Sequence, residues 1–254
     1  MSFWLAILLG AIQGITEFLP VSSSGHLLIA ERIFGVEVDA LFLNVLLHFA
    51  TLLAVLWYYR KTLWQMIKNP FCKMNLYLVI ATIPAVVFVL VFGSLIEDML
   101  SASSFVAIGF FVSAVLLSVG QLAYARLPER PLDLKLALTM GVAQAFAVFP
   151  GISRSGTTFS FGLMAGAEKK SALDFSFLMS IPIIIASLCY ELVFSKIDFS
   201  LVSTNWFAIA TSFLVAFLTA ILGIKVMQKL VRKINFWWFV PYLVVMGAIL
   251  LIWL

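Results

Sequence analysis

The segment PGISRSGTT, residues 150–158, places an arginine within a chain that is otherwise built for lipid. Proline ends an incoming helix, and glycine lets the backbone approach a ligand closely. The hydroxyl residues that follow begin a new helix, whose first N–H groups have no partner within the helix. Free N–H groups, hydroxyls and a guanidinium together form an anion site. Because a charged side chain is costly in a membrane, this segment predicts a functional site.

The composition supports a membrane protein. The chain has 254 residues, of which 63% are hydrophobic and 11% charged, whereas a soluble domain carries about 25% charged residues. Cys72 and Cys189 lack metal-ligand spacing, so no structural zinc is expected. The first residues have no basic region and no small-residue cleavage site, so no removable signal peptide is expected. The cations follow membrane topology, so no nucleic-acid partner is expected.

Spanning helices need about 20 apolar residues, and six stretches satisfy this length. They are residues 41–59, 74–96, 99–125, 171–194, 199–224 and 234–254. Two further regions are broken. Apolar residues 1–16 and 18–30 are split by Glu17 and the turn at 20–25, and residues 136–153 and 155–167 are split at Arg154.

Each broken region is either a kinked spanning helix or a re-entrant helical hairpin, and the charges favour the hairpin. With two hairpins, thirteen cations fall on one side, in loops 60–73, 125–135, 168–171 and 225–235. The opposite side holds Arg32 and Lys196 beside six acids, namely Glu31, Glu37, Asp39, Glu97, Asp98 and Asp198. The positive-inside rule then places both termini outside the cytoplasm. If both broken regions crossed the membrane fully, the basic loop 225–235 would fall on the side opposite the basic loops 60–73 and 125–135.

The two broken regions resemble each other. Gly10, Gln13, Phe18, Ser24 and Gly25 recur 131 positions later as Gly141, Gln144, Phe149, Ser155 and Gly156. This indicates a single integral membrane domain, 1–254, with repeats at about 1–126 and 127–254. Each repeat would contain one hairpin and three spans, and this odd number of crossings inverts the second repeat in the membrane. Inverted repeats with broken helices bring both breaks to the midplane. We therefore expect an all-α polytopic membrane protein, with six transmembrane helices plus two re-entrant helical hairpins in an inverted-topology repeat.

The first broken region supplies groups for proton transfer and nucleophilic attack. Gln13 and Glu17 are four residues apart and share a helix face, which leads into the hydroxyls of Ser22–Ser24. His26 follows and can exchange a proton near neutral pH. The structural alternatives are that Glu17 only pairs with Arg154 and that His26 is a hydrogen-bonded core residue. His48 stays open between packing and support of the site, and Asp174 is a further candidate to support Arg154.

Segments QGITEFLPVSSSGH, residues 13–26, and PGISRSGTT, residues 150–158, resemble the two motifs of the bacitracin-resistance family of undecaprenyl-diphosphate phosphatases. The resemblance covers essentially the whole chain. It implies removal of the terminal phosphate of undecaprenyl (polyprenyl) diphosphate, giving the monophosphate lipid carrier of cell-wall synthesis. It also implies a divalent cation, Mg²⁺ or Ca²⁺, and a location in the bacterial inner (cytoplasmic) membrane.

The resemblance assigns expected roles to the matched positions. Glu17 binds metal or assists proton transfer, with Gln13 as a second metal ligand, and Ser23 or His26 attacks or activates the attacking group. Arg154 clamps the diphosphate and stabilises transition-state charge. The other expected diphosphate-binding residues are Ser22, Ser24, Gly151, Ser153, Ser155 and Thr158. Some family members have glutamate at position 13; an amide cannot act as a base, so Glu17 carries that charge alone.

Three alternatives compete with this interpretation. Acid-phosphatase-like lipid phosphatases share Ser-Gly-His and Ser-Arg segments, but Ser160 stands where that class has its second histidine. A polyprenyl-phosphate transporter or flippase is suggested by the inverted repeat. A structural scaffold leaves Glu17, His26 and Arg154 unexplained. The sequence leaves open the nucleophile, the metal, the leaflet to which the site opens, and whether the chain forms a homodimer.

Overall fold

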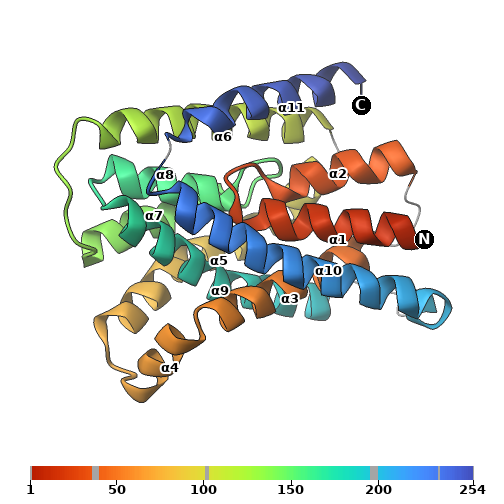
Figure 1. Ribbon diagram of the computed structural model, residues 1–254, viewed down its shortest axis with the longest axis horizontal. Coiled ribbons are helices and arrows are strands. Elements are labelled where there is room, and N and C mark those ends of the chain that lie inside the picture. The colour runs from red at the N-terminus through yellow and green to blue at the C-terminus, as the bar shows by residue number, and fades with distance from the viewer. Residues whose placement is uncertain (1, 36–39, 101–102, 195–199, 234, 254) are drawn as a thin grey trace.

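The computed structural model describes residues 2–35, 40–100, 103–194, 200–233 and 235–253, and within these ranges the fold is entirely helical (Figure 1). Glu37, Asp39, Lys196 and Asp198, which entered the topology prediction, lie outside the described residues. The described part contains eleven α-helices and one 3₁₀ helix. In chain order they are α1 (Phe3–Phe18), α2 (Ser23–Phe34), α3 (Ala40–Tyr58), α4 (Arg60–Lys68), α5 (Lys73–Leu100), α6 (Ser103–Tyr124), α7 (Leu134–Phe146), α8 (Arg154–Met164), α9 (Lys169–Phe194), α10 (Ser200–Leu230), η1 (Phe236–Trp238) and α11 (Phe239–Trp253).

The long helices make this a multi-pass membrane protein. Among the described residues, four apolar segments within α5, α6, α9 and α10 are long enough to span: Lys73–Gly93, Ser104–Tyr124, Lys169–Val193 and Trp206–Leu230. The bent pair α3–α4 makes a fifth candidate. The sixth predicted span, 234–254, contains α11, whose 15 residues rise about 22 Å. That is less than the roughly 30 Å of a bilayer core, so length and composition support four or five of the six spans.

Helix α4 departs from the prediction of a basic loop at 60–73. Residues Arg60–Lys68 are helical, bent by 73° from the end of α3, and none of them is buried. The Arg60 guanidinium lies 4.8 Å from the Trp57 ring centroid, and the Lys68 ammonium lies 5.5 Å from that of Trp64. Tryptophan and basic residues gather where a membrane meets water. This helix therefore has the character of an interfacial segment.

Both predicted helix breaks are confirmed. The first lies between α1 and α2 and the second between α7 and α8. Ser22 and Gly151 have positive φ angles of 68° and 78° at these breaks. No residue other than glycine fits at position 151, since a Cβ there would lie 2.0 Å from the Val106 carbonyl oxygen. Because α2 and α8 have only 12 and 11 residues, each rises less than about 20 Å. Each is therefore shorter than the roughly 30 Å of a bilayer core.

The helices of the two halves pack in matching pairs. Helix α1 lies along α10 and α7 lies along α5, while α6 packs against α11 and α8, and α3 packs mainly against α10. A Cβ on Gly10 would lie 2.4 Å from the Ser212 carbonyl oxygen, and one on Gly141 would lie 2.6 Å from Ala81 Cα. Gly10 and Gly141 differ by 131 positions, as do Ala81 and Ser212. The same close helix contact thus occurs twice, once in each half.

Candidate functional site

The two helix breaks meet inside the protein. The Ser155 hydroxyl donates to the Leu19 carbonyl oxygen at 3.0 Å, which joins the second break to the first. The Ser22 hydroxyl accepts from the Gly25 N–H at 3.4 Å, and the Ser153 hydroxyl accepts from the Gly156 N–H at 3.1 Å. Helices α2 and α8 therefore both begin, capped in the same way, where the breaks touch. Their N-terminal partial positive charges favour an anion there.

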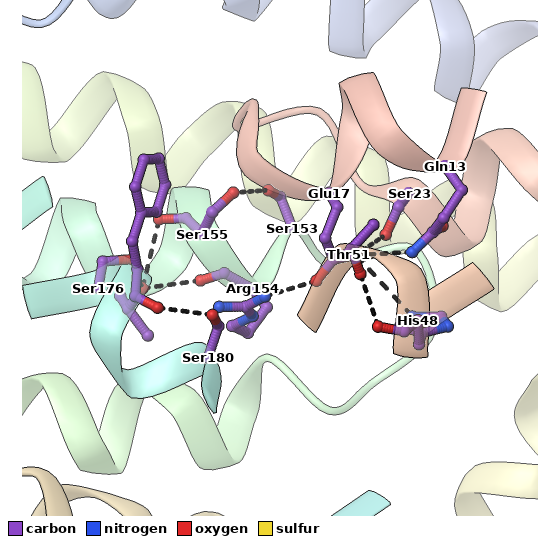
Figure 2. A network of polar contacts seen from close by, with 12 residues as sticks. Gln13, Glu17, Ser23, His48, Thr51, Ser153, Arg154, Ser155, Ser176 and Ser180 are labelled. Carbon is purple, nitrogen blue, oxygen red and sulfur yellow. Dashed lines mark hydrogen bonds and ion pairs between the residues drawn. The ribbon is translucent and has the colours of Figure 1, made fainter. Parts of the chain in front are cut away.

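A buried ion pair joins the two breaks. The Arg154 Nη2 atom lies 2.5 Å from Glu17 Oε1, and the two side chains are 15% and 6% exposed. The other Glu17 oxygen, Oε2, accepts from Ser23 Oγ at 2.7 Å and from Gln13 Nε2 at 3.1 Å. Figure 2 shows these side chains converging from α1, α2 and α8. The structure thus brings Gln13, Glu17, Ser23 and Arg154 together, as the sequence predicted.

His48 of α3 also reaches this cluster. Its Nε2 atom lies 3.8 Å from Glu17 Oε2, and its Nδ1 atom lies 2.8 Å from the Asn44 carbonyl oxygen. A carbonyl only accepts, so Nδ1 carries a proton and orients the ring. Sequence reasoning left His48 open because no motif surrounds it. The single available signal was an ionisable residue inside an apolar span.

His26 lies elsewhere. Its Nδ1 atom bonds the Ser22 carbonyl oxygen at 2.7 Å, and its Nε2 atom lies 2.5 Å from the Tyr242 hydroxyl. The ring stacks on Tyr242 and packs edge-on against Phe110. These contacts direct His26 toward α6 and α11 rather than toward the Glu17–Arg154 pair. The geometry corresponds to the alternative of a hydrogen-bonded core histidine.

Three of the four hydroxyl residues of the second motif divide into two groups, and the fourth, Thr157, is buried without a hydrogen-bond partner. Ser153 lines the cavity beside Arg154, and its N–H donates to Ser113 Oγ at 2.8 Å. Ser155 bonds the first break, as described above, and the Thr158 hydroxyl lies 2.6 Å from that of Ser176 on α9. Ser155 and Thr158 therefore tie the second motif to neighbouring segments.

Asp174 does not support Arg154. Its carboxylate accepts from Tyr59 at 2.7 Å, from Gln228 at 2.5 Å and from Lys170 at 2.7 Å. These partners come from the α3–α4 junction, α10 and α9. Asp174 therefore joins three helices away from the candidate site.

A cavity of about 350 Å³ opens beside the ion pair. Its polar wall includes Glu17, Ser22, Ser23, Ser24, His48, Ser153 and Arg154. Its apolar wall comes from α5 and α9 and includes Val86, Val89, Leu90, Ile183 and Ile184. The volume lies within the range of small-molecule sites. A ligand with an anionic head and an apolar tail matches both walls.

The oxygen atoms near Glu17 fit a divalent cation in part. No group of three or more His, Cys, Asp or Glu side chains within the described ranges is arranged to hold a metal. However, the buried Gln13 Oε1 atom has no hydrogen-bond partner, and it lies on the side chain that bonds Glu17. One carboxylate and one amide oxygen suffice when substrate phosphates complete the shell, as is usual for Mg²⁺.

Comparisons with known proteins identify the family of the chain. The family model for "Bacitracin resistance protein BacA" matches residues 6–249. A protein of Korarchaeum cryptofilum named undecaprenyl-diphosphatase is 35% identical over 262 residues, covering 97% of each chain. Proteins of the same name from Methanobrevibacter smithii, 35% identical over 96% of this chain and 97% of that one, and Christiangramia forsetii, 36% identical over 97% and 96%, are also similar. With the sequence motifs joined in one buried cluster and the match spanning nearly its whole length, the chain belongs to the bacitracin resistance protein BacA family.

Proposed function

We propose that this protein is an undecaprenyl-diphosphatase, a membrane phosphatase that removes the terminal phosphate of undecaprenyl (polyprenyl) diphosphate. The observation that carries the proposal is the meeting of two helix N-termini around Arg154, Glu17 and Ser23 in a cavity with one apolar wall. The names of the relatives state the same activity. The product, a polyprenyl monophosphate, is the lipid carrier for cell-wall synthesis.

Ser23 is the proposed nucleophile. Its hydroxyl already donates to Glu17 Oε2 at 2.7 Å, so the carboxylate is placed to take the proton as the oxygen attacks the terminal phosphorus. The P–O bond to the bridging oxygen then breaks, and the polyprenyl monophosphate leaves with that oxygen. Water next attacks the phosphoserine, which releases inorganic phosphate and restores the hydroxyl. His26, with both ring nitrogens engaged, is assigned a positioning role for the first break.

Arg154 and the two helix N-termini stabilise the charge that builds on the phosphoryl oxygens. Ser22, Ser24, Ser153 and the backbone around Gly151 complete the proposed diphosphate site. Glu17 and Gln13 would hold a divalent cation, Mg²⁺ or Ca²⁺, which would supply positive charge to neutralise part of the diphosphate. The apolar residues of α5 and α9 in the cavity wall receive the first isoprene units of the lipid.

We infer that the chain crosses the cell membrane six times, with α1–α2 and α7–α8 as re-entrant hairpins in an inverted repeat. The matching Gly10–Ser212 and Gly141–Ala81 contacts support the repeat. Figure 1 shows both chain ends at one end of the molecule, with the basic helix α4 and the α6–α7 connection at the other. This polarity supports extracytoplasmic termini.

A lipid transporter or flippase is the second candidate, and it is favoured by the same twofold pattern of contacts. One experiment separates the two. Purified protein in vesicles with polyprenyl diphosphate and Mg²⁺ or Ca²⁺ releases phosphate, and Ser23→Ala abolishes the release. Absence of release by the unaltered protein would reject the phosphatase. Lipid movement between leaflets by Ser23→Ala vesicles would support the transporter.

A further inference from the structure

Gln144 on α7 is a buried amide without a partner. Its side chain is 0% exposed, and neither Nε2 nor Oε1 has a hydrogen-bond partner. A buried polar group without a hydrogen bond costs stability, so natural proteins seldom keep one. A partner that arrives with a ligand explains why this one persists.

The position of Gln144 identifies the ligand. Gln144 forms part of the wall of the same cavity as Arg154 and Ser153. Arg154 Nη2 bonds Glu17, but Arg154 Nη1 is buried and also lacks a partner. Two sets of unused N–H donors, one from α7 and one from α8, therefore belong to one cavity. Unused donors in a cavity that also holds the N-terminus of α8 favour an anion.

The repeat explains why the protein itself offers Gln144 no partner. Gln144 is the counterpart of Gln13, 131 positions earlier. The Gln13 amide donates to Glu17, four residues further along α1. In the second repeat the position four residues further along is Val148, which has no acceptor. The amide is thus kept while its carboxylate partner is replaced by an apolar side chain.

We propose that Gln144 is a diphosphate-binding residue, whose Nε2 donates to a phosphate oxygen while Arg154 Nη1 donates to another. This inference rests on the proposed function and adds a residue that neither motif contains. A neutral amide binds the anion without adding charge to the site. Gln144 therefore contributes to substrate affinity more than to the chemical step.

The test replaces the amide by an apolar side chain of similar size, Gln144→Leu. Since a hydrogen bond to a charged group is lost, KM for polyprenyl diphosphate should rise about tenfold, with kcat changed by less than about threefold. Thermal unfolding in detergent should be unchanged or shifted upward, because an unsatisfied polar group is removed. An unchanged KM would overturn the proposal, and so would a lower unfolding temperature with KM and kcat both at the level of the unaltered protein.

Ser160→Ala is the matched control. The Ser160 hydroxyl is also buried and unpartnered, but it lies on α8 against Gly120 of α6 and does not line the cavity. Removal of this hydroxyl should leave KM unchanged. A rise in KM equal to that of Gln144→Leu would mean that any buried hydroxyl or amide here affects binding, and it would overturn the specific role of Gln144.

A binding assay keeps this proposal separate from the proposed function. Inorganic pyrophosphate should raise the unfolding temperature of the unaltered protein and of Ser160→Ala, and raise that of Gln144→Leu at about tenfold higher concentration. This holds whether or not phosphate is released. Gln144→Glu should raise KM further by repulsion. If Gln144→Glu instead leaves KM intact and lowers the Ca²⁺ concentration required, the amide binds the cation and the proposal fails.

Discussion

The Glu17–Arg154 ion pair is the contact whose removal is most informative. Glu17 is buried and the Arg154 side chain is only 15% exposed, with Nη2 and Oε1 2.5 Å apart. At an effective dielectric constant of about 20, unit charges at that separation attract by roughly 7 kcal/mol, which is offset by several kcal/mol of desolvation. Removing one partner leaves the other charge buried, which costs about 3–5 kcal/mol.

The two single variants should differ. In Arg154→Met the Glu17 carboxylate keeps its hydrogen bonds from Gln13 and Ser23. The loss in free energy of unfolding should therefore lie near the lower figure, about 3 kcal/mol. In Glu17→Gln the guanidinium keeps an amide oxygen but loses its anion, so the cost should lie near about 5 kcal/mol. For a chain of this size each kcal/mol lowers Tm by about 2–4 °C.

The double variant Glu17→Gln/Arg154→Met separates stability from catalysis. With both charges removed, Tm should recover to above that of either single variant, because no buried charge is left unpaired. Phosphate release should stay at least about 10³-fold below that of the unaltered protein in all three variants, since each variant lacks the Glu17 base, the Arg154 phosphoryl clamp or both. The assays are thermal unfolding in detergent and phosphate release from polyprenyl diphosphate.

Two results would refute this account. Single variants that unfold at the temperature of the unaltered protein would show that the ion pair does not exist in the membrane protein. A double variant that regains hydrolysis together with stability would show that the pair serves folding alone.

Three further predictions follow from individual contacts. Gly141→Ala should reduce the free energy of unfolding by about 1–3 kcal/mol and so lower Tm, because the added Cβ would lie 2.6 Å from Ala81 Cα. An unchanged Tm in a detergent unfolding scan would contradict this contact. Tyr242→Phe should cost about 1 kcal/mol of stability and leave kcat within about threefold, since His26 acts by position; a kcat reduced tenfold or more would return His26 to catalysis. Gln13→Glu should lower the half-saturating Mg²⁺ or Ca²⁺ concentration about tenfold, because it adds a second carboxylate to the cation site. Phosphate release measured at increasing cation concentration checks this. An unchanged half-saturating concentration would place the cation elsewhere.

Much of the site was predictable because its residues carry strong local signals. Arg154 between a proline, glycines and hydroxyls has few structural uses within a membrane, and Glu17 four residues after Gln13 must share its helix face. The helix breaks follow from Pro20 and Pro150, and capping by Ser22 and Ser153 follows from local geometry. These features depend on neighbours in sequence, so the sequence contains them.

Other features depend on contacts between distant segments. His26 follows the serines directly, yet Ser22 and Tyr242 hold it away from the ion pair. His48, with no motif around it, lies 3.8 Å from Glu17 because α3 packs beside α1. Asp174 bonds Tyr59 and Gln228 rather than Arg154. Only the packing of the helices decides which of several polar side chains points at one cavity.

The segment PGISRSGTT by itself determined that the chain breaks a helix next to an arginine, and it predicts an anion site at that break. Local steric rules and the high cost of a bare charge in lipid leave little choice at those residues. The tertiary structure decided the surroundings of that arginine: Nη2 bonds Glu17, whereas Nη1 is buried without a partner on a residue that lines the same cavity as Gln144. Glu17 lies 137 residues away from Arg154, and only helix packing brings them together.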